Sequence, residues 1–364
     1  MIPIAKPNIG KEEEEAVLEV LRSGMLARGP KTKEFEASFA QYIGTDHAIS
    51  TSSGTTALHI ALLANGIGKD DEVLIPPVTF FATASTVLFC GAKPVFVDID
   101  PDTFNMDVGK VEETITPKTK AIVPVHMYGQ PVDMKPLMEI AERHDLKIIE
   151  DACQSHGAEY DGKKVGTFGD ASCFSFYPTK NMVAGEGGMI TTDDGDLKTE
   201  CTLLREHGEI THYEHVVLGY NFRITEIGAA IGGEQLKKLP GFIEKRRANA
   251  KRLNEGLGDL EGIQTPKVIA NVTHVYYQYI IKVDGFPLNR DRLVEFLESK
   301  EIGARPSYPK PISEQAILRT LGVGADCPVA RGMLPKMMEL PVHPLVSDED
   351  ITYIIDAVKE AGRA

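Results

Sequence analysis

The chain has 364 residues, of which 42% are hydrophobic and 25% are charged, and its formal net charge is −14. This length exceeds one ordinary hydrophobic core, so we expect two domains, or one large domain and one small. The acidic balance argues against a broad surface for nucleic acid or acidic membrane, and no apolar run reaches the ~18 residues of a membrane span. We therefore expect neither nucleic acid nor a membrane as a partner.

The five cysteines are odd in number, scattered, and free of Cys-x-x-Cys spacing. This usage is typical of buried thiols in a reducing compartment, and zinc-ligand spacing is absent, so we expect no metal. The first residues also lack a signal-peptide pattern. Together these features predict a cytoplasmic protein.

Two helices are expected first, at residues 11–23 and 31–43. The earlier segment carries acidic residues in its first turn, where the helix dipole favours them. In the later segment Phe35, Phe39 and Tyr42 fall at i, i+4 and i+7, which predicts one apolar face.

After these helices, short apolar strands alternate with helical stretches. The strands are expected at 48–50, 72–75, 94–97, 121–125, 147–150, 171–176 and 189–192, and the helices at 56–65, 82–89, 134–144 and 197–206. Near-continuous Val/Ile strands separated by helices predict an α/β fold with a mostly parallel sheet covered on both faces. Ligands on such sheets bind at the carboxyl ends of the strands.

The pattern of alternating strands and helices ends at about residue 239. The elements expected there are a helix at 241–257, a strand at 275–283, a helix at 289–300 and a last helix at 348–361. We interpret this part as a smaller α+β domain. The predicted division is a large domain over residues 1–240 and a small C-terminal domain over residues 241–364.

A lysine follows the strand expected at 171–176. The stretch from Phe174 to Asn181 reads Phe-Ser-Phe-Tyr-Pro-Thr-Lys-Asn, and a glycine-rich turn comes after it. A lysine held against aromatic surface is desolvated, so its neutral amine can attack a carbonyl and form a Schiff base. An isolated Tyr-Pro-Thr-Lys sequence favours a surface lysine; the surrounding pattern makes Lys180 a catalytic candidate.

An aspartate, Asp151, ends the buried strand expected at 147–150. A lysine and an aspartate from separate strand ends are what pyridoxal 5'-phosphate requires, because the lysine holds its aldehyde and the aspartate pairs with its pyridinium nitrogen. Without such a cation the buried carboxylate would be costly. Asp151 and Lys180 therefore predict this cofactor.

A small-residue stretch at 52–58 leads from a strand into a helix and includes Gly54 and Thr55. Its backbone N–H groups and the positive helix end favour a phosphate, whereas Ser and Thr there are equally typical of a plain helix cap. Beside a Schiff-base lysine the phosphate site is the preferred interpretation.

Several further side chains are candidates for holding the cofactor ring. Phe80 is our choice to stack on it, and its neighbour Phe81 then belongs to the core. Gln154 can bind the phenolic oxygen of the ring. His156 is either a substrate contact or a structural histidine. Asn221 is a candidate for a phosphate contact, although its stretch taken alone is more typical of an ordinary helix-entry turn.

These pieces, in this order, resemble the nucleotide-sugar aminotransferase family (the DegT–StrS group), within the aspartate-aminotransferase superfamily of fold type I. The likeness covers nearly the whole chain. The stretches that carry it are Gly29-Pro30 with Phe35-Glu36, Ser53 to Leu58, Glu150 to Ala158, Phe174 to Asn181, Gly219 to Arg223, and Leu340 to Pro344.

The resemblance implies a role for each matching residue. Lys180 binds the cofactor and later shuttles a proton, Asp151 holds the ring nitrogen, Gln154 the ring oxygen, and Phe80 stacks on one face. The phosphate is held by a further set: Gly54, Thr55, Ser175 and, from the neighbouring subunit, Asn221. That last role implies a homodimer with a shared active site.

The implied reaction is amino transfer from an amino acid, by family likeness glutamate, to a keto-sugar nucleotide, with pyridoxamine 5'-phosphate as the intermediate cofactor form. One alternative keeps the cofactor and changes the acceptor to a cyclitol or amino-acid ketone. An amino-acid enzyme usually fixes a carboxylate with a bidentate arginine, for which Arg223 and Arg305 are candidates. A second alternative is a non-catalytic regulator that binds pyridoxal phosphate.

Overall fold

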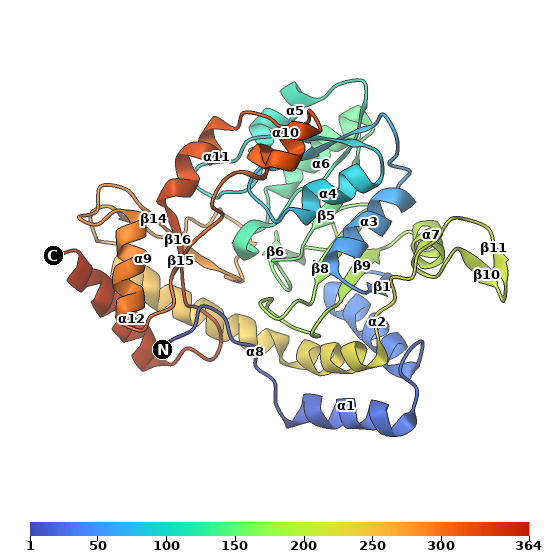
Figure 1. Cartoon of the computed structure of the whole chain (residues 1–364), viewed down its shortest axis with the longest axis horizontal. Coiled ribbons are helices and arrows are strands. Elements are labelled where there is room, and N and C mark those ends of the chain that lie inside the picture. The colour runs from blue at the N-terminus through green and yellow to red at the C-terminus, as the bar shows by residue number, and fades with distance from the viewer. Residues whose placement is uncertain (364) are drawn as a thin grey trace.

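The computed structural model of the chain describes residues 1–363. At its centre lies a seven-stranded sheet in the order β1-β9-β8-β5-β4-β2-β3 (Figure 1). The strands are β1 (His47–Thr51), β2 (Glu72–Ile75), β3 (Lys93–Phe96), β4 (Thr119–Ile122), β5 (Lys147–Asp151), β8 (Ala171–Ser175) and β9 (Gly188–Thr192).

The sheet is largely parallel, as predicted. Strands β3, β2, β4, β5 and β8 run parallel to one another, while β9 is antiparallel to both β8 and β1. A loop without a helix joins β8 to β9, so the chain returns antiparallel instead of crossing over. This α/β architecture confirms the predicted fold class.

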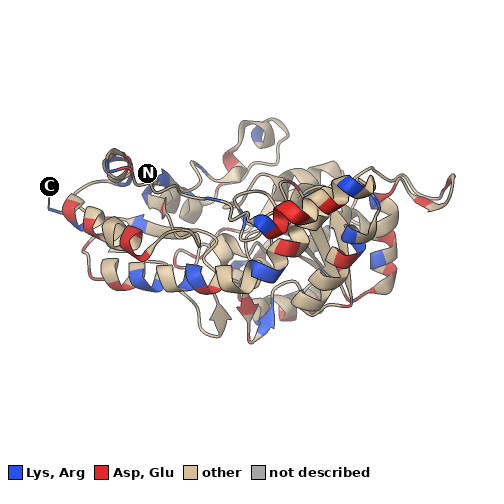
Figure 2. Ribbon diagram, turned by 90° about the horizontal axis from the view of Figure 1, so that it is seen from below, with Lys and Arg blue, Asp and Glu red and all other residues tan. Residues whose placement is uncertain are grey.

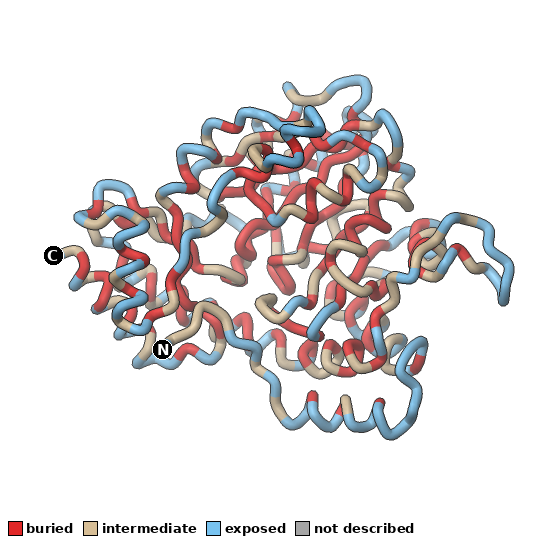
Figure 3. The backbone as a smooth tube through the Cα atoms, in the orientation of Figure 1, coloured by how far each residue is buried: buried red, intermediate tan, exposed pale blue. Residues whose placement is uncertain are grey.

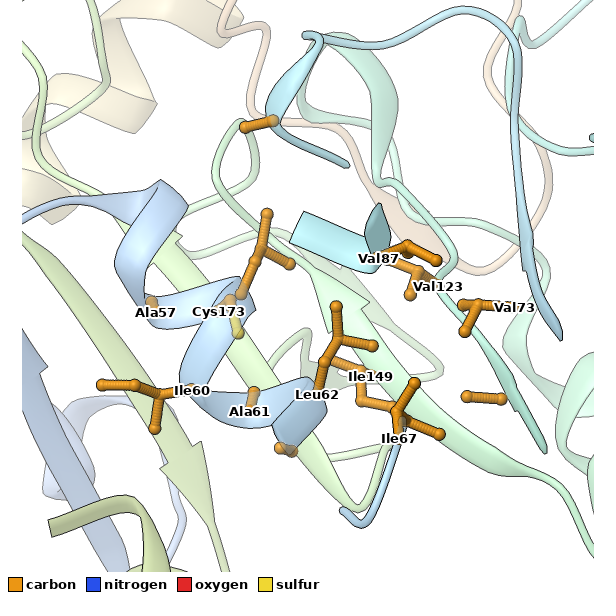
Figure 4. Close-up of a cluster of buried hydrophobic side chains, with 14 of the residues drawn as sticks. Ala57, Ile60, Ala61, Leu62, Ile67, Val73, Val87, Val123, Ile149 and Cys173 are labelled. Carbon is orange, nitrogen blue, oxygen red and sulfur yellow. The ribbon is translucent and has the colours of Figure 1, made fainter. Parts of the chain in front are cut away.

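Helices cover the sheet and bury its apolar side chains. Ala61 and Leu62 of helix α3 cluster with Ile149 of β5 and Cys173 of β8, and all four are fully buried (Figure 4). Burying such a Leu or Ile stabilises the fold by about 1.5–3 kcal/mol. The helices of this part are α2 (Pro30–Ile43), α3 (Gly54–Ala64), α4 (Ala82–Phe89), α5 (Val111–Thr114), α6 (Met134–His144) and α7 (Gly195–Arg205).

The long helix α8 (Glu226–Leu257) begins well before residue 241, where the sequence predicted its start. Thr225 caps it by accepting a 3.1 Å hydrogen bond from the Gly228 N–H. The helix continues through Pro240 because buried side chains lie on both sides of the proline, which outweighs its poor helix propensity. Helix α1 (Lys11–Ser23) packs along α8 (Figure 1).

A second sheet of four antiparallel strands, in the order β12-β14-β16-β15, forms the C-terminal part with helices α9 (Arg290–Ser299) and α12 (Asp348–Ala361). The expected strand at 275–283 is shorter, because Val275 N–H instead binds the Gly129 carbonyl of the large part. Strand β16 was not predicted. The strands are β12 (Ile263–Gln264), β14 (Tyr279–Val283), β15 (Arg305–Pro306) and β16 (Met337–Leu340).

Many hydrophobic residues of this C-terminal part form a cluster of their own with the end of α8, whereas Ile312 and Leu318 join the core of the central sheet. Helix α8 crosses the predicted division between residues 240 and 241, which stays a prediction. Smaller elements complete the chain: α10 (Ala316–Thr320), α11 (Pro328–Met333), β6 (Glu159–Tyr160), β7 (Lys163–Lys164) and β13 (Val272–Thr273).

Strands β10 (Glu209–Thr211) and β11 (Glu214–His215) form a hairpin that projects from the body, mostly exposed (Figures 1 and 3). In the view of Figure 2, basic and acidic residues alternate along the surface helices rather than gathering into one basic stretch. Within residues 1–363, no helix has the length and apolar character needed to cross a bilayer.

Candidate active site

A cavity of about 840 Å³ lies where the sheet strands β1, β5 and β8 end. Segments far apart in the sequence meet there, as expected for a ligand site at the carboxyl ends of parallel strands. All of the predicted site residues except Asn221 line it: Gly54, Thr55, Phe80, Asp151, Gln154, Ser175 and Lys180.

Asp151, the last residue of β5, is only 4% exposed. Its Oδ2 accepts a 2.9 Å hydrogen bond from Thr83 Oγ1, and its Oδ1 accepts one of 3.2 Å from the Cys153 N–H. No cationic side chain of residues 1–363 forms an ion pair with it. A buried carboxylate held only by neutral donors is costly, so the site favours a ligand that brings a cation to it.

Thr79 and Thr83 hold this carboxylate in place, and sequence reasoning missed both. Their hydroxyls lie 2.9 Å apart, and both side chains are buried. The detectable signal was two hydroxyl side chains four residues apart in an otherwise apolar segment, Thr79 in the loop before α4 and Thr83 in its first turn.

Lys180 lies in the loop after β8. Its backbone N–H donates to the Tyr177 carbonyl over 2.9 Å, which closes a turn. The Nζ atom lies 4.6 Å from the centre of the Tyr277 ring, and the Tyr277 hydroxyl lies 3.0 Å from Thr179 Oγ1. Tyr277 comes from the segment before β14 and was not predicted as a site residue. The aromatic surface against Lys180 is therefore supplied from far along the chain.

The N-terminus of α3 offers free donors to the cavity. The Ser53 side chain caps the helix by accepting from the Thr56 N–H over 3.2 Å. The N–H groups of Gly54 and Thr55 make no hydrogen bond within the described chain, so the helix cap and a phosphate site coexist. A Cβ on Gly54 would lie 2.7 Å from the Ser175 Cβ, so glycine keeps this cradle open.

Gln154 and Phe80 complete the set around a planar ligand. Gln154 Oε1 accepts from the Tyr128 N–H over 3.0 Å, and its Nε2 donates to the Tyr308 hydroxyl over 3.3 Å. Phe80 lines the cavity but is 65% exposed, whereas Phe81 packs against the core. An exposed aromatic ring at the cavity is available for stacking.

The remaining candidate residues differ in whether they line the cavity. His156 is buried between the rings of Phe174 and Phe176, and burial lowers its pKa to about 3, so it is neutral and outside the lining. Asn221 is exposed and also outside the lining. Of the two arginine candidates, Arg305 lines the cavity and Arg223 does not; among other polar residues of the C-terminal part, Tyr308 lines it, whereas Lys310 and His343 do not.

The C-terminal part supplies the other end of the cavity. Glu339 of β16 is buried, and its Oε2 accepts 2.7 Å hydrogen bonds from Arg305 Nε and Gln278 Nε2. Burial raises the pKa of the Glu339 carboxyl, and the adjacent guanidinium of Arg305 works against that shift. Sequence reasoning missed Glu339, although one charge within an apolar strand signals a buried polar group.

This cavity fits pyridoxal 5'-phosphate. The uncompensated Asp151 suits a pyridinium nitrogen, Lys180 suits an aldehyde, and the free N–H groups of Gly54 and Thr55 suit a phosphate. Gln154 and Phe80 lie in the same cavity, where a ring oxygen and a ring face need partners.

Comparisons with known proteins agree with this geometry. Residues 7–359 match the DegT/DnrJ/EryC1/StrS aminotransferase family. The chain is 40% identical to GDP-perosamine synthase of Caulobacter vibrioides, over 99% of this chain and 98% of the relative. It is 43% identical to a pleiotropic regulatory protein of Geobacillus stearothermophilus, over 95% and 93% of the two chains.

Among solved structures, S. venezuelae DesV in complex with a ketimine intermediate is similar, with a TM-score of 0.93 and 36% identity over 97% of this chain and 95% of that one. The chain therefore belongs to the DegT/DnrJ/EryC1/StrS aminotransferase family and is a pyridoxal-phosphate-dependent aminotransferase of fold type I.

Proposed function

We propose that the protein transfers an amino group from an amino acid, with glutamate as the expected donor, to the ketone of a keto-sugar nucleotide. The observation that carries the proposal is the buried, cation-free Asp151 in one cavity with Lys180. The family match and the relative named GDP-perosamine synthase support a sugar nucleotide as acceptor.

Bound pyridoxal phosphate supplies a carbonyl for the amine and an electron sink for the carbanion that deprotonation leaves. Lys180 Nζ moves the proton to and from the reacting carbon as a general acid–base group. Asp151 keeps a proton on the ring nitrogen, and Thr83 orients the Asp151 carboxylate. Gln154 is fixed by Tyr128 for contact with the ring oxygen.

The remaining residues position the cofactor. The free N–H groups of Gly54 and Thr55, with the Ser175 hydroxyl, bind its phosphate, and Phe80 stacks on the ring. Tyr277 covers Lys180 and limits the access of water to its amine. A cavity of about 840 Å³ leaves room beside the cofactor for a sugar, next to polar side chains of the C-terminal part such as Gln278, Ser307 and Tyr308.

The proposed assembly is a homodimer with a shared active site, in which Asn221 reaches the neighbouring subunit's phosphate. Its support is the β10–β11 hairpin, which projects from the body and carries or adjoins exposed apolar residues. Leu218, at 95% exposure, lies three residues before Asn221. Large apolar side chains gathered on a projecting arm mark a protein contact. The other exposed apolar residues on or beside the hairpin are Ile210, Tyr213 and Val216.

The proposal extends to location and domain organisation. We place the protein in the cytoplasm, where sugar nucleotides are made and where its five free thiols suit a reducing medium. The large domain at 1–240 would carry the cofactor. The small domain at 241–364 would close the cavity through Arg305, Tyr308 and Glu339, in keeping with the separate hydrophobic cluster that many of its residues form.

Two readings compete with this one. The acceptor could be a cyclitol or amino-acid ketone, since the cavity lining is polar without being specific for a nucleotide. A regulator that binds the cofactor without turnover is the second, and the relative named pleiotropic regulatory protein gives it a specific basis.

A two-stage experiment separates these readings. L-Glutamate is added to the cofactor-loaded protein, and conversion of the pyridoxal to the pyridoxamine form is followed by absorbance. The pyridoxamine-loaded protein then receives a keto-sugar nucleotide, a keto-cyclitol or a simple keto acid. We expect conversion in the first stage and reversal fastest with the keto-sugar nucleotide. A protein that no amino donor converts is a regulator, and preference for another ketone overturns the proposed acceptor.

A further inference from the structure

The end of the cavity formed by the C-terminal part has a single positive group of its own. Among the lining residues only Lys180 and Arg305 are cationic, and Lys180 is assigned to the cofactor. An anionic group on a substrate that enters this end therefore meets Arg305. The Arg305 side chain is about half exposed (46%), so its charge is accessible from the cavity.

The guanidinium of Arg305 is held by one edge only. Its Nε donates to Glu339 Oε2 over 2.7 Å, whereas its two Nη nitrogens make no hydrogen bond within residues 1–363. Gln278 Nε2 fixes the same Glu339 oxygen from the other side, also at 2.7 Å. Because Glu339 is buried and doubly bound, it anchors Arg305 and leaves the Nη nitrogens available to a carboxylate.

The position of this pair suits an amino acid. Gln278, which shares Glu339 with Arg305, adjoins Tyr277, whose ring lies 4.6 Å from Lys180 Nζ. The α-carboxylate of an amino donor is one bond from the carbon that carries the amine, so its binding group must lie close to the reacting lysine. A diphosphate carries more charge than one arginine already paired with a carboxylate can match.

Glu339 also addresses the problem of two unlike substrates in one cavity. A lone arginine facing a neutral sugar ring would lose its hydration without gaining a partner, at a cost in binding. Glu339 keeps Arg305 paired when the sugar is present. An incoming carboxylate shares the same guanidinium through its free Nη edge.

We infer that Arg305, anchored by Glu339, is the binding site for the carboxylate of the amino donor, and that the pair lets one cavity accept either an anionic amino acid or a neutral sugar ring. The inference rests on the proposed function and adds to it the recognition of the donor.

The primary test uses an unreactive probe. Glutarate, a dicarboxylate without an amine or ketone, is titrated by calorimetry into the cofactor-loaded wild-type protein and into Arg305→Gln, Arg305→Lys and Lys310→Gln. Lys310 is exposed, lies five residues away and does not line the cavity, so its variant is a matched loss of charge. Loss of a hydrogen bond to a charged group of this kind raises the Kd roughly 10- to 100-fold.

We expect Arg305→Gln to weaken glutarate binding by that factor, Arg305→Lys to weaken it less, and Lys310→Gln to leave it unchanged. The concentration of L-glutamate that half-saturates the first stage should rise in parallel, with the sugar stage altered at most a few-fold. Equal glutarate binding by wild type and Arg305→Gln overturns the inference, as does a variant that weakens only the sugar nucleotide.

Glu339→Gln gives an independent check, because it removes the compensating charge but keeps a hydrogen-bonding side chain. Its thermal melt and cofactor absorbance report folding. We expect tighter glutarate binding and a slower sugar stage, and the reverse pattern contradicts the inference. If wild type binds glutarate but no amino acid converts its cofactor, the proposed function fails while the carboxylate site stands as a binding site.

Discussion

Thr83 Oγ1 donates a 2.9 Å hydrogen bond to Asp151 Oδ2, and this contact joins the first turn of α4 to the end of β5. Thr79 Oγ1, 2.9 Å from Thr83 Oγ1, fixes the orientation of that hydroxyl. Neutral donors thus hold the carboxylate in place without cancelling its charge. Asp151 is in this way oriented for a cationic ligand rather than satisfied by the protein.

Replacing Thr83 by Val removes this donor at nearly constant volume. We expect a loss of roughly 1.5–3 kcal/mol in cofactor binding, because a hydrogen bond to a charged group is lost. Equilibrium dialysis of pyridoxal phosphate against the purified variant measures the change.

Thr86→Val is the matched control for this variant. Thr86 is buried one turn further along α4, and its hydroxyl donates to the Ala82 carbonyl over 2.9 Å without touching Asp151. It should destabilise the fold by a similar small amount and leave cofactor affinity intact. Equal cofactor affinities in the two variants would show that the Thr83 contact is only structural.

Gly54→Ala should close the cradle at the start of α3. The added methyl would lie 2.7 Å from Ser175 Cβ and 3.0 Å from Cys153 Sγ, so it forces the phosphate site apart. We expect cofactor affinity to fall at least tenfold, which corresponds to about 1.4 kcal/mol. Gly233→Ala, on α8 with no atom near its Cβ, should instead stabilise the protein by roughly 0.5–1 kcal/mol. Unchanged cofactor affinity in Gly54→Ala would show that the N-terminus of α3 does not bind the phosphate.

Much of the fold follows from periodicity. Helices α1 and α12 begin and end at the predicted residues, because caps and amphipathic spacing are local properties of the sequence. The predicted start of α8 was wrong, and the reason is not local to the sequence. Its first half is held by burial of Leu236 and Leu239 under other elements, and a glycine-rich sequence with a proline carries no trace of that packing.

The grouping of Asp151, Ser175 and Lys180 in one cavity was predictable because they lie at or just after the carboxyl ends of the parallel strands β5 and β8. The topology of a parallel sheet brings Asp151, Ser175 and Lys180 to one edge whatever the loops do. The substrate side was not predictable in the same way. Tyr277 and Glu339 reach the cavity only through the docking of the C-terminal part, which no local pattern encodes.

Acid should destabilise the protein through its buried histidines. Burial lowers the pKa of His156 and of His274 to about 3, so the folded state keeps each ring neutral, while in the unfolded state each protonates near its ordinary pKa of 6.5. Their contribution to the free energy of unfolding is fully present above about pH 6.5. Below that pH the free energy of unfolding falls by about 1.4 kcal/mol per pH unit for each histidine.

Urea unfolding midpoints at about pH 7.5 and about pH 5.5 measure this loss, and His156→Leu should make it smaller by one histidine's share. His212→Leu removes a histidine whose side chain is 90% exposed and should leave the pH dependence unchanged. A His156 variant with the wild-type pH dependence would mean that the ring is protonated in the folded state.

Lys180 should be the residue that borohydride links covalently to the cofactor. Within residues 1–363 two lysines lie over tyrosine rings, Lys180 at 4.6 Å from the Tyr277 ring and Lys164 at 5.1 Å from the Tyr42 ring, but only Lys180 lines the cavity. The reactive amine is thus distinguished by its position in the same cavity as Asp151, and not by aromatic cover. We expect peptide mapping of reduced, cofactor-loaded wild type and Lys164→Ala to find the label on Lys180. Lys180→Ala should carry no label and lose roughly 10²- to 10⁴-fold in rate from proton transfer alone. A label on any other side chain in the wild type would contradict the assignment, because the reacting carbon would then lie outside the reach of the groups that line this cavity.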